Sequence, residues 1–403
     1  MEYINTPINK IGRVVTGKTP LTAKAEFYDG EIMFITPTEL HTNFIVESSE
    51  KTITQKGFNS IKSNTISGIS VLVGCIGWDM GNVALCTETC ATNQQINSIT
   101  AIEAKYNPLY LYYWLKTKKE YLFSIASVTR TPILSKGVFE EILVPMPKKK
   151  VQDAIVEVLG SIDKKITINN RINDNLQQQL KLLYDYWFTQ FDFPNEEGKP
   201  YRSSGGQMVW NEELKRYIPV GWSVLTLSDL LEKNTVAFDY ASVEPAIDLS
   251  VMPSDSIALS QLNTSSIFTT NLYKMKRGDI LFGSIRPYLH KAGIAPCDGV
   301  VAGTVHSYSV KKGQDYNFSV ITLTRDMFFD YAVNLSSGTK MPVISSDSIL
   351  AYKIAYHPDI VEEFNRIQLM ETITQNIQEN QKLIALRDWL LPMLMNGQAI
   401  IQD

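Results

Sequence analysis

The sequence has few residues of the types that hold metals, since it contains four cysteines and four histidines in 403 residues. The histidines are scattered and have no metal-ligand spacing: His41, His290, His306 and His357. Cys86 and Cys90 are close in sequence, but no further ligand residue accompanies them, so they are weak zinc candidates. We therefore expect reduced thiols and no metal site.

A net positive charge and long apolar runs are also missing. The formal net charge is −4, which argues against a protein that binds nucleic acid by bulk charge, although local basic patches remain compatible with it. No run of about 18 apolar residues occurs, so no membrane span is expected. The first residues, MEYINTPINK, lack a basic leader and an apolar core, so we expect no secretory signal and a cytoplasmic protein.

Enzymatic motifs are absent or incomplete. Asn107–Tyr110 reads Asn-Pro-Leu-Tyr and lacks the second proline of an adenine methyltransferase signature, so it is better explained as the start of a helix. Val73–Gly77 lacks the Lys-Ser/Thr of a phosphate-binding loop, and no Gly-x-Ser-x-Gly elbow occurs. These absences favour a protein without catalytic activity.

One long helix is predicted from Lys148 to about Phe191. The segment lacks proline, and its apolar stripe advances by alternating four and three residues, the spacing that faces a partner helix. The stripe is Ile155, Leu159, Ile162, Ile166, Asn169, Asn173, Leu176, Leu180, Leu183 and Trp187. At about 1.5 Å per residue the helix would be roughly 60 Å long.

A second long helix is predicted from Ile360 to about Gly397, with the polar residue Asn380 in its stripe. Polar residues in such a seam fix register at some cost in stability. Two such helices pair most simply in an antiparallel arrangement. Alternatively, each stripe packs on its own globular domain.

The rest of the chain forms two lobes of short strands and helices, so we predict a mixed α/β fold. Within the first lobe, Leu109–Leu122 is expected to form one amphipathic helix. The predicted domains are a first lobe over 1–147, the first long helix over 148–192, a connector over 193–221, a second lobe over 222–357 and the second long helix over 358–398.

The two lobes align as an internal repeat. Thr129–Ser135 matches Thr339–Ser345, and the central prolines, Pro132 and Pro342, are 210 positions apart. Each segment precedes a short strand and then a long helix. A tandem repeat with antiparallel helices has pseudo-two-fold symmetry, which suits a split DNA target. A scaffold that holds two protein partners would have the same pattern.

Two segments resemble a known family. The segment NNRINDNLQQQLKLLYDYWFTQFDFPNEEGKPYRSSGGQMVWNEELKRYIPVGW resembles the central region of type I restriction–modification specificity subunits. The tail QENQKLIALRDWLLPMLMNGQ resembles their C-terminal conserved region. The lobes resemble the target recognition domains of this family in pattern only.

The resemblance implies two target recognition domains that each read one half of a bipartite double-stranded DNA sequence. It implies long helices that set the gap and dock two modification subunits, which bind S-adenosylmethionine and methylate adenine. It further implies restriction subunits that use ATP and magnesium. No cofactor is expected in this chain. The alternative is a scaffold or dimerisation module that does not read DNA.

Candidate DNA contacts are Arg, Lys, Asn, Thr and aromatic residues in loops, since these side chains can bond bases or phosphates. In the first lobe they are Lys18, Thr19, Thr129, Arg130, Thr131 and Lys136. In the second lobe they are Arg286, Tyr288, His290, Lys291, Thr339 and Lys340. Each could instead be an ordinary surface residue.

Large apolar groups near the helix ends are candidate anchors for a partner subunit: Trp187, Phe188, Phe191 and Trp389. Packing between the two helices, or onto the connector, would explain them equally well. If they are exposed, we expect poor solubility of the isolated chain.

Overall fold

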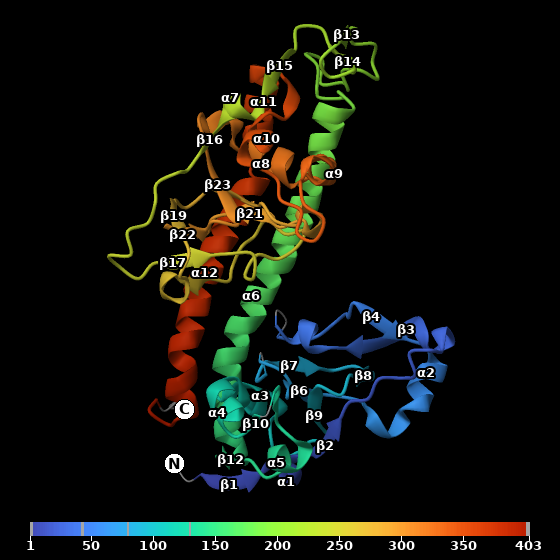
Figure 1. Ribbon diagram of the computed structural model, residues 1–403, viewed down its shortest axis with the longest axis vertical. Coiled ribbons are helices and arrows are strands. Elements are labelled where there is room, and N and C mark those ends of the chain that lie inside the picture. Colours follow the sequence, from blue (N-terminus) through green and yellow to red (C-terminus); the bar gives the residue numbers. More distant parts are fainter. Residues whose placement is uncertain (1–2, 42–43, 79, 129, 400–403) are drawn as a thin grey trace. The chain divides into compact units, whose positions relative to one another are not determined.

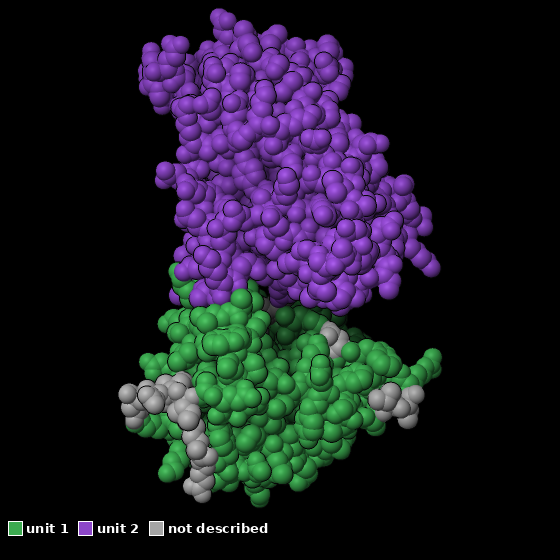
Figure 2. Space-filling view, turned by 90° about the vertical axis from the view of Figure 1, so that its left-hand side faces the viewer, with its two compact units in different colours: residues 1–165, 384–403 green, residues 166–383 purple. Residues whose placement is uncertain are grey.

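The computed structural model describes residues 3–41, 44–78, 80–128 and 130–399. The chain divides into two compact units, which Figure 2 colours separately. Unit 1 comprises residues 1–165 and 384–403, and unit 2 comprises residues 166–383. Both units contain helices and strands, which confirms the predicted mixed α/β fold. No described helix is long and apolar enough to cross a membrane.

Unit 1 is built on two four-stranded sheets (Figure 1). The first has the order β2-β9-β6-β7, and its strands are Arg13–Thr16, Ile96–Thr100, Ser70–Gly74 and Val83–Cys86. The second has the order β4-β3-β8-β5, and its strands are Lys51–Ile53, Tyr28–Ile35, Cys90–Thr92 and Thr65–Ile66. All pairs are antiparallel except β3 with β8. The interior strands are rich in β-branched residues and almost fully buried, as expected for strands covered on both faces.

Helices cover the first sheet of unit 1. Helix α3, Pro108–Lys116, begins with a proline at its first turn, and the side chain of Asn107 accepts a hydrogen bond from the Leu109 amide. Helix α4, Lys119–Ser124, follows after a break at Thr117 and Lys118. The single helix expected over Leu109–Leu122 is therefore two helices. The remaining elements are α1 Ile8–Ile11, α2 Gln55–Ser60, α5 Lys136–Glu140, and the pair β1 Ile4–Pro7 with β12 Leu143–Met146.

Unit 2 repeats this arrangement of strands. Its first sheet has the order β16-β23-β20-β21, with strands Leu231–Lys233, Val305–Val310, Ile280–Gly283 and Ala292–Ile294. Its second has the order β18-β17-β22-β19, with strands Asn263–Thr264, Pro245–Ile247, Gly299–Ala302 and Leu272–Met275. The pair β17 with β22 is parallel, like β3 with β8 in unit 1. The internal repeat seen in the sequence is therefore a repeat of sheet topology.

The other elements of unit 2 flank these sheets. Strand β15, Ser223–Thr226, pairs with β24, Lys353–Tyr356, as β1 pairs with β12 in unit 1. The helices are α7 Leu227–Leu230, α8 Tyr316–Thr324, α9 Asp326–Leu335, α10 Ser346–Leu350 and α11 Pro358–Asn365. The hairpin of β13 Met208–Asn211 and β14 Arg216–Pro219 lies near the end of the long helix α6 (Figure 1).

The first long helix is α6, Lys149–Tyr184, which continues as a π-helical turn over Asp185–Thr189. The second is α12, Leu369–Met395. It does not join α11, because the chain leaves the helical path at 366–368, so the expected single helix over 358–398 is two helices. The predicted stripes face inward: in unit 1 Leu159 is fully buried, and in unit 2 Leu180 and Ile373 are fully buried.

Asparagines pair the two helices within unit 2. Asn169 donates to Oδ1 of Asn380 (2.9 Å) and to Oε2 of Glu379 (2.7 Å), and Asn380 donates to Oδ1 of Asn170 (2.8 Å). The pairs Asn169–Glu379 and Asn170–Asn380 are both separated by 210 residues, the offset of the repeat. Each residue therefore meets its own repeat equivalent. Asn376 donates to Oδ1 of Asn173 (2.8 Å), so the partner on α12 has a lower number as the position on α6 rises, which confirms the antiparallel pairing of the helices. The two pairs at the repeat offset place a local two-fold relation at this level.

A buried ion pair joins the same two helices within unit 1. The Arg387 guanidinium lies 2.9 Å from Oδ1 of Asp163, whose side chain is 4% exposed. Oδ2 of Asp163 accepts a second hydrogen bond from the hydroxyl of Tyr113 (2.7 Å). Burial raises the pKa of Tyr113, and the neighbouring Asp163 carboxylate raises it further. The partners that satisfy Asp163 therefore come from α12 and α3.

The aromatic residues at the end of α6 lie in the core of unit 2. Trp187, Phe188 and Phe191 are 7%, 3% and 1% exposed. Phe188 packs against Phe318 (4.7 Å between ring centroids) and Phe364 (5.3 Å). The prediction that these three side chains anchor a partner is wrong, because unit 2 buries them in its own core. Trp389 on α12 is 61% exposed, and its role in partner binding stays a prediction.

Candidate nucleic-acid interface

A short hairpin forms one edge of unit 1. Strands β10, Ser127–Val128, and β11, Pro132–Ile133, pair antiparallel and enclose the first tip loop, which is described at residues 130 and 131. The loop after β6 lies beside this hairpin. Gly77 donates its backbone N–H to the Pro132 carbonyl (2.9 Å), and Leu134 donates to the Cys75 carbonyl (2.8 Å).

Unit 2 has the same backbone pattern at its edge. Ser337 and Val343 pair as an isolated bridge and enclose the second tip loop, residues 338–342. Arg286 donates its backbone N–H to the Pro342 carbonyl (2.7 Å), and Ile344 donates to the Ser284 carbonyl (2.9 Å). These bonds are the repeat equivalents of those in unit 1. Each unit therefore places the loop after its central strand against its tip loop.

Of the residues of unit 1 that were predicted to contact DNA, two lie on the first tip loop and Lys18 is linked to this edge through backbone bonds. Arg130 and Thr131 are exposed on the first tip loop, whereas Thr129 lies outside the described residues. The exposed Lys18 donates its backbone N–H to the Thr92 carbonyl (2.9 Å).

The loop that follows Thr92 completes this link. The hydroxyl of Thr19 donates to Oε1 of Gln94 (2.8 Å), and the carbonyl of Gln95 accepts from the backbone N–H of Cys75 (2.7 Å). Lys18 and Thr19 are thereby joined to the loop that holds the first tip loop.

Lys136 lies in a different setting. It begins α5, and its Nζ lies 3.3 Å from Oε1 of Glu140. Together with Lys10 and Arg13 it lines a cavity of about 410 Å³. Its charge is already partly neutralised by Glu140, so the structure gives Lys136 less support as a DNA contact than Arg130.

Four residues over 286–291 were predicted to contact DNA. Two of their side chains are exposed to solvent, and the other two pack against the protein. Arg286 and Tyr288 are exposed, and the tyrosine is 51% exposed. Lys291 instead donates its Nζ to the Leu249 carbonyl (2.6 Å), and burial lowers the pKa of its ammonium group. His290 stacks on Phe329 with ring centroids 4.3 Å apart. We infer that His290 and Lys291 hold the loop, whereas Arg286 and Tyr288 are available to a ligand.

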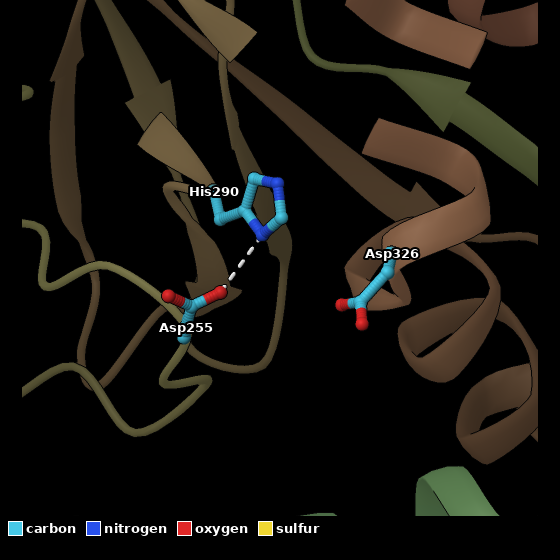
Figure 3. Close-up of side chains that lie close together, drawn as sticks. All are labelled: Asp255, His290 and Asp326. Carbon is cyan, nitrogen blue, oxygen red and sulfur yellow. Dashed lines mark hydrogen bonds and ion pairs between the residues drawn. The ribbon is translucent and has the colours of Figure 1, made fainter. Parts of the chain in front are cut away.

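His290 belongs to a group that has the donor types for a metal ion. Its Nδ1 lies 2.8 Å from Oδ1 of Asp255, and Asp326, the first residue of α9, faces this pair (Figure 3). One ligand atom of each residue lies within 4.8 Å of the others. However, the Lys181 ammonium lies 3.7 Å from Asp326, so the carboxylate already has a cationic partner. The contacts of His290 therefore favour a structural role.

Thr339 and Lys340 are both exposed on the second tip loop, as predicted from the sequence. Lys340 occupies the repeat position of Arg130. Next to this edge lies a cavity of about 590 Å³ that is lined by apolar and polar residues, the polar ones including Lys233, Asn234, Thr304 and His306. Ser284 donates its backbone N–H to the Thr304 carbonyl (2.9 Å), which ties the cavity wall to the loop after β20. Sequence reasoning missed this cavity, because its residues are scattered along the chain.

Sequence reasoning also missed two exposed apolar residues at these edges. Trp78 follows Gly77 and is 70% exposed, and Met341 is 52% exposed on the second tip loop. Met341 lies in the aligned segment Thr339–Ser345, whereas Trp78 lies outside the two aligned segments. Exposed aromatic and basic groups thus gather at equivalent edges of both units.

Comparisons with known proteins agree with this arrangement. Residues 4–178 match the family model described as the type I restriction modification DNA specificity domain. The MjaIX specificity subunit of a type I restriction enzyme from Methanocaldococcus jannaschii is 26% identical, over 98% of this chain and 93% of its own length. The chain is thus similar to type I restriction–modification specificity subunits over nearly its whole length.

Two further comparisons agree with this family. The type I restriction enzyme HindI specificity subunit of Haemophilus influenzae is 28% identical over 44% of this chain and 39% of its own length. The crystal structure of a type I restriction–modification S subunit from M. genitalium has a TM-score of 0.53 at 14% identity. It covers 98% of this chain and 96% of that one. This structural similarity shows that the fold is shared over nearly the whole chain.

Proposed function

We propose that this chain is the DNA-recognition subunit of a type I restriction–modification complex. Unit 1 and unit 2 each read one half of a bipartite double-stranded target, and the chain itself performs no chemistry. The observation that carries this proposal is the equivalence of the two edges. Each combines an exposed tip loop, an exposed basic residue and an exposed aromatic residue on the same backbone pattern. The match of residues 4–178 to a DNA specificity domain supports the ligand class.

The charges at the edges suit this role. Arg can bond guanine bidentately, Lys contacts phosphates or guanine, and the methyl group of Thr can meet that of thymine. Arg130 and Thr131 in unit 1, and Arg286, Thr339 and Lys340 in unit 2, are exposed side chains of these types. Since the net charge of the chain is −4, we expect local contacts rather than bulk charge to position the DNA.

The proposed partners supply the chemistry. Two modification subunits would bind S-adenosylmethionine and methylate adenine, and two restriction subunits would use ATP and magnesium to cut DNA. The exposed Trp389 on α12 is the remaining candidate anchor for a modification subunit. We further propose that the complex acts in the cytoplasm.

The test is modified-base sequencing of DNA from cells that express this chain with its candidate modification subunit. We expect methyl-adenine at one split motif with two defined halves and a fixed gap. A chimaera in which residues 222–357 are exchanged for those of another specificity subunit should change only one half. If a stable complex gives no methylation beyond that of the modification subunit alone, the recognition proposal fails and a protein scaffold becomes the better explanation.

A further inference from the structure

The loop after β6 in unit 1 carries the most exposed tryptophan whose exposure the structure gives. Trp78 is 70% exposed, compared with 61% for Trp389 and 46% for Trp210. Leaving an indole ring in water forgoes the stabilisation that its burial would provide. The ring makes an intramolecular contact with Phe123, whose ring centroid lies 6.0 Å away, which supports one side of the indole. The other side is open.

The backbone ties the residue before Trp78 to the hairpin that carries the first tip loop. Gly77 has a left-handed conformation, with φ of 105°, and donates its N–H to the Pro132 carbonyl in the hairpin that carries Arg130. Trp78 follows directly. An exposed aromatic ring and an exposed basic residue are therefore carried by two loops that a backbone hydrogen bond joins. This combination fits nucleic acid, since basic groups meet phosphates while aromatic rings pack on bases or wedge into base steps.

Unit 2 has the same arrangement of backbone and aromatic side chain at the equivalent loop. Arg286 also adopts a left-handed conformation, with φ of 53°, and donates its N–H to the Pro342 carbonyl. Tyr288, two residues later, is 51% exposed. Each unit thus presents one exposed aromatic ring within two residues of the left-handed position. A random exposed tryptophan would not be expected to have such a counterpart.

We propose that Trp78 is a specificity-determining contact of unit 1, whose indole packs against one base step in the half of the target that unit 1 reads. This inference rests on the proposed function. The side chain acts through shape and stacking rather than hydrogen-bond readout. It therefore selects base steps that open easily, an indirect form of specificity.

The experiment compares three variants of the full chain in complex with the modification subunit: Trp78→Ala, Tyr288→Ala and Ile69→Ala. Ile69 is an exposed apolar residue just before the opposite end of β6, so it serves as the matched control in unit 1. Binding to the wild-type target is measured with labelled duplex DNA, and the methylated motif is determined by sequencing. We expect Trp78→Ala to weaken binding about tenfold or more, the range for loss of one aromatic contact with a base.

The inference is decided by which half of the methylated motif changes in each variant. Trp78→Ala should relax only the half read by unit 1, Tyr288→Ala only the other half, and Ile69→Ala neither. Trp78→Phe should keep part of the specificity, which separates loss of the contact from loss of folding. Wild-type affinity and motif for Trp78→Ala would overturn the inference. So would weaker association with the modification subunit and an equal loss in both halves, since these would make Trp78 a protein contact. If wild-type protein methylates no split motif, the proposed function itself has failed.

Discussion

The two units use the same backbone pattern with different side chains at equivalent positions. The residue that bonds the tip loop is Gly77 in unit 1 and Arg286 in unit 2, and both have positive φ. The contacts between α6 and α12 also differ between the two units. Asp163 and Arg387 form a buried ion pair in unit 1, whereas their repeat positions in unit 2 hold Ile373 and Gln177. The two units therefore share their backbone geometry, whereas the side chains at equivalent positions differ in chemistry.

In unit 2, Gln177 makes neutral hydrogen bonds at the position that corresponds to the charged Arg387 of unit 1. It donates to the Asp255 carbonyl (2.8 Å) and accepts from the Ile257 backbone N–H (2.9 Å). Both partners are neutral backbone groups. Losing a neutral hydrogen-bond partner costs less than leaving a buried charge alone. The seam should thus be more sensitive to substitution in unit 1 than in unit 2.

The largest expected effect follows from breaking the ion pair. Arg387→Ala leaves the Asp163 carboxylate buried without its cationic partner, so the free energy of unfolding should fall by about 3–5 kcal/mol. The matched change in unit 2, Gln177→Ala, should cost about 1–3 kcal/mol. Denaturant titration gives both values, and hydrogen exchange locates the loss on α6 and α12.

Placing the neutral residues of unit 2 at the positions of the ion pair in unit 1 tests the same difference between the two units. The double variant Asp163→Ile, Arg387→Gln should recover most of the stability that Arg387→Ala loses, because replacing both charges removes the uncompensated one. The buried Tyr113 hydroxyl would still lose its acceptor, at a cost of about 1–3 kcal/mol. Equal losses for Arg387→Ala and Gln177→Ala would contradict the proposed difference between the two seams.

The next largest effect concerns the two tip loops. Arg130→Ala and Lys340→Ala each remove one exposed basic group, and a lost base contact costs about 1–3 kcal/mol of binding. We expect the two variants to lower the fidelity of opposite halves of the target. Motif determination by modified-base sequencing checks this. Normal methylation of the intact target by the Arg130 variant would remove that residue from the interface.

A smaller effect is expected at the left-handed positions. Arg286→Gly should raise the free energy of unfolding by about 1 kcal/mol, because glycine adopts positive φ without the steric cost that arginine has. Gly77→Ala should lower it by a similar amount, although a Cβ there would meet no atom within 4 Å. Thermal unfolding of both variants tests the sign. A stabilised but less specific Arg286→Gly variant would indicate that unit 2 keeps a strained arginine for recognition.

The smallest effect depends on pH and on unit 2. Burial lowers the pKa of His306, and nearby Lys233 lowers it further, so the folded protein binds this proton less readily than the unfolded chain. Stability should therefore decrease as the pH falls below about 6.5, the ordinary pKa of histidine. The variant His306→Gln should have a shallower dependence over this range. An unchanged dependence would mean that other groups control it.

The sequence predicted the repeat, the long helix pair and the tip loops, because these depend on periodicity and on local punctuation. It could not predict which side chains turn inward. Lys291 and His290 look like surface residues in sequence, but their partners, Leu249 and Phe329, are about 40 residues away along the chain. The burial of Phe188 likewise depends on Phe318 and Phe364 from other elements. Trp78 was overlooked because its exposure is evident only in three dimensions.

The bonds that hold the tip loops have a consequence for how such a protein changes over generations. Pro132 and Pro342 accept from the chain itself, and Leu134 and Ile344 donate to it, so no side chain at positions 130 or 340 is needed to keep the fold. Substitutions there should be nearly neutral for folding. Single substitutions in these exposed tip loops can thus change which target sequence is preferred. The stability of the underlying fold is little affected by them.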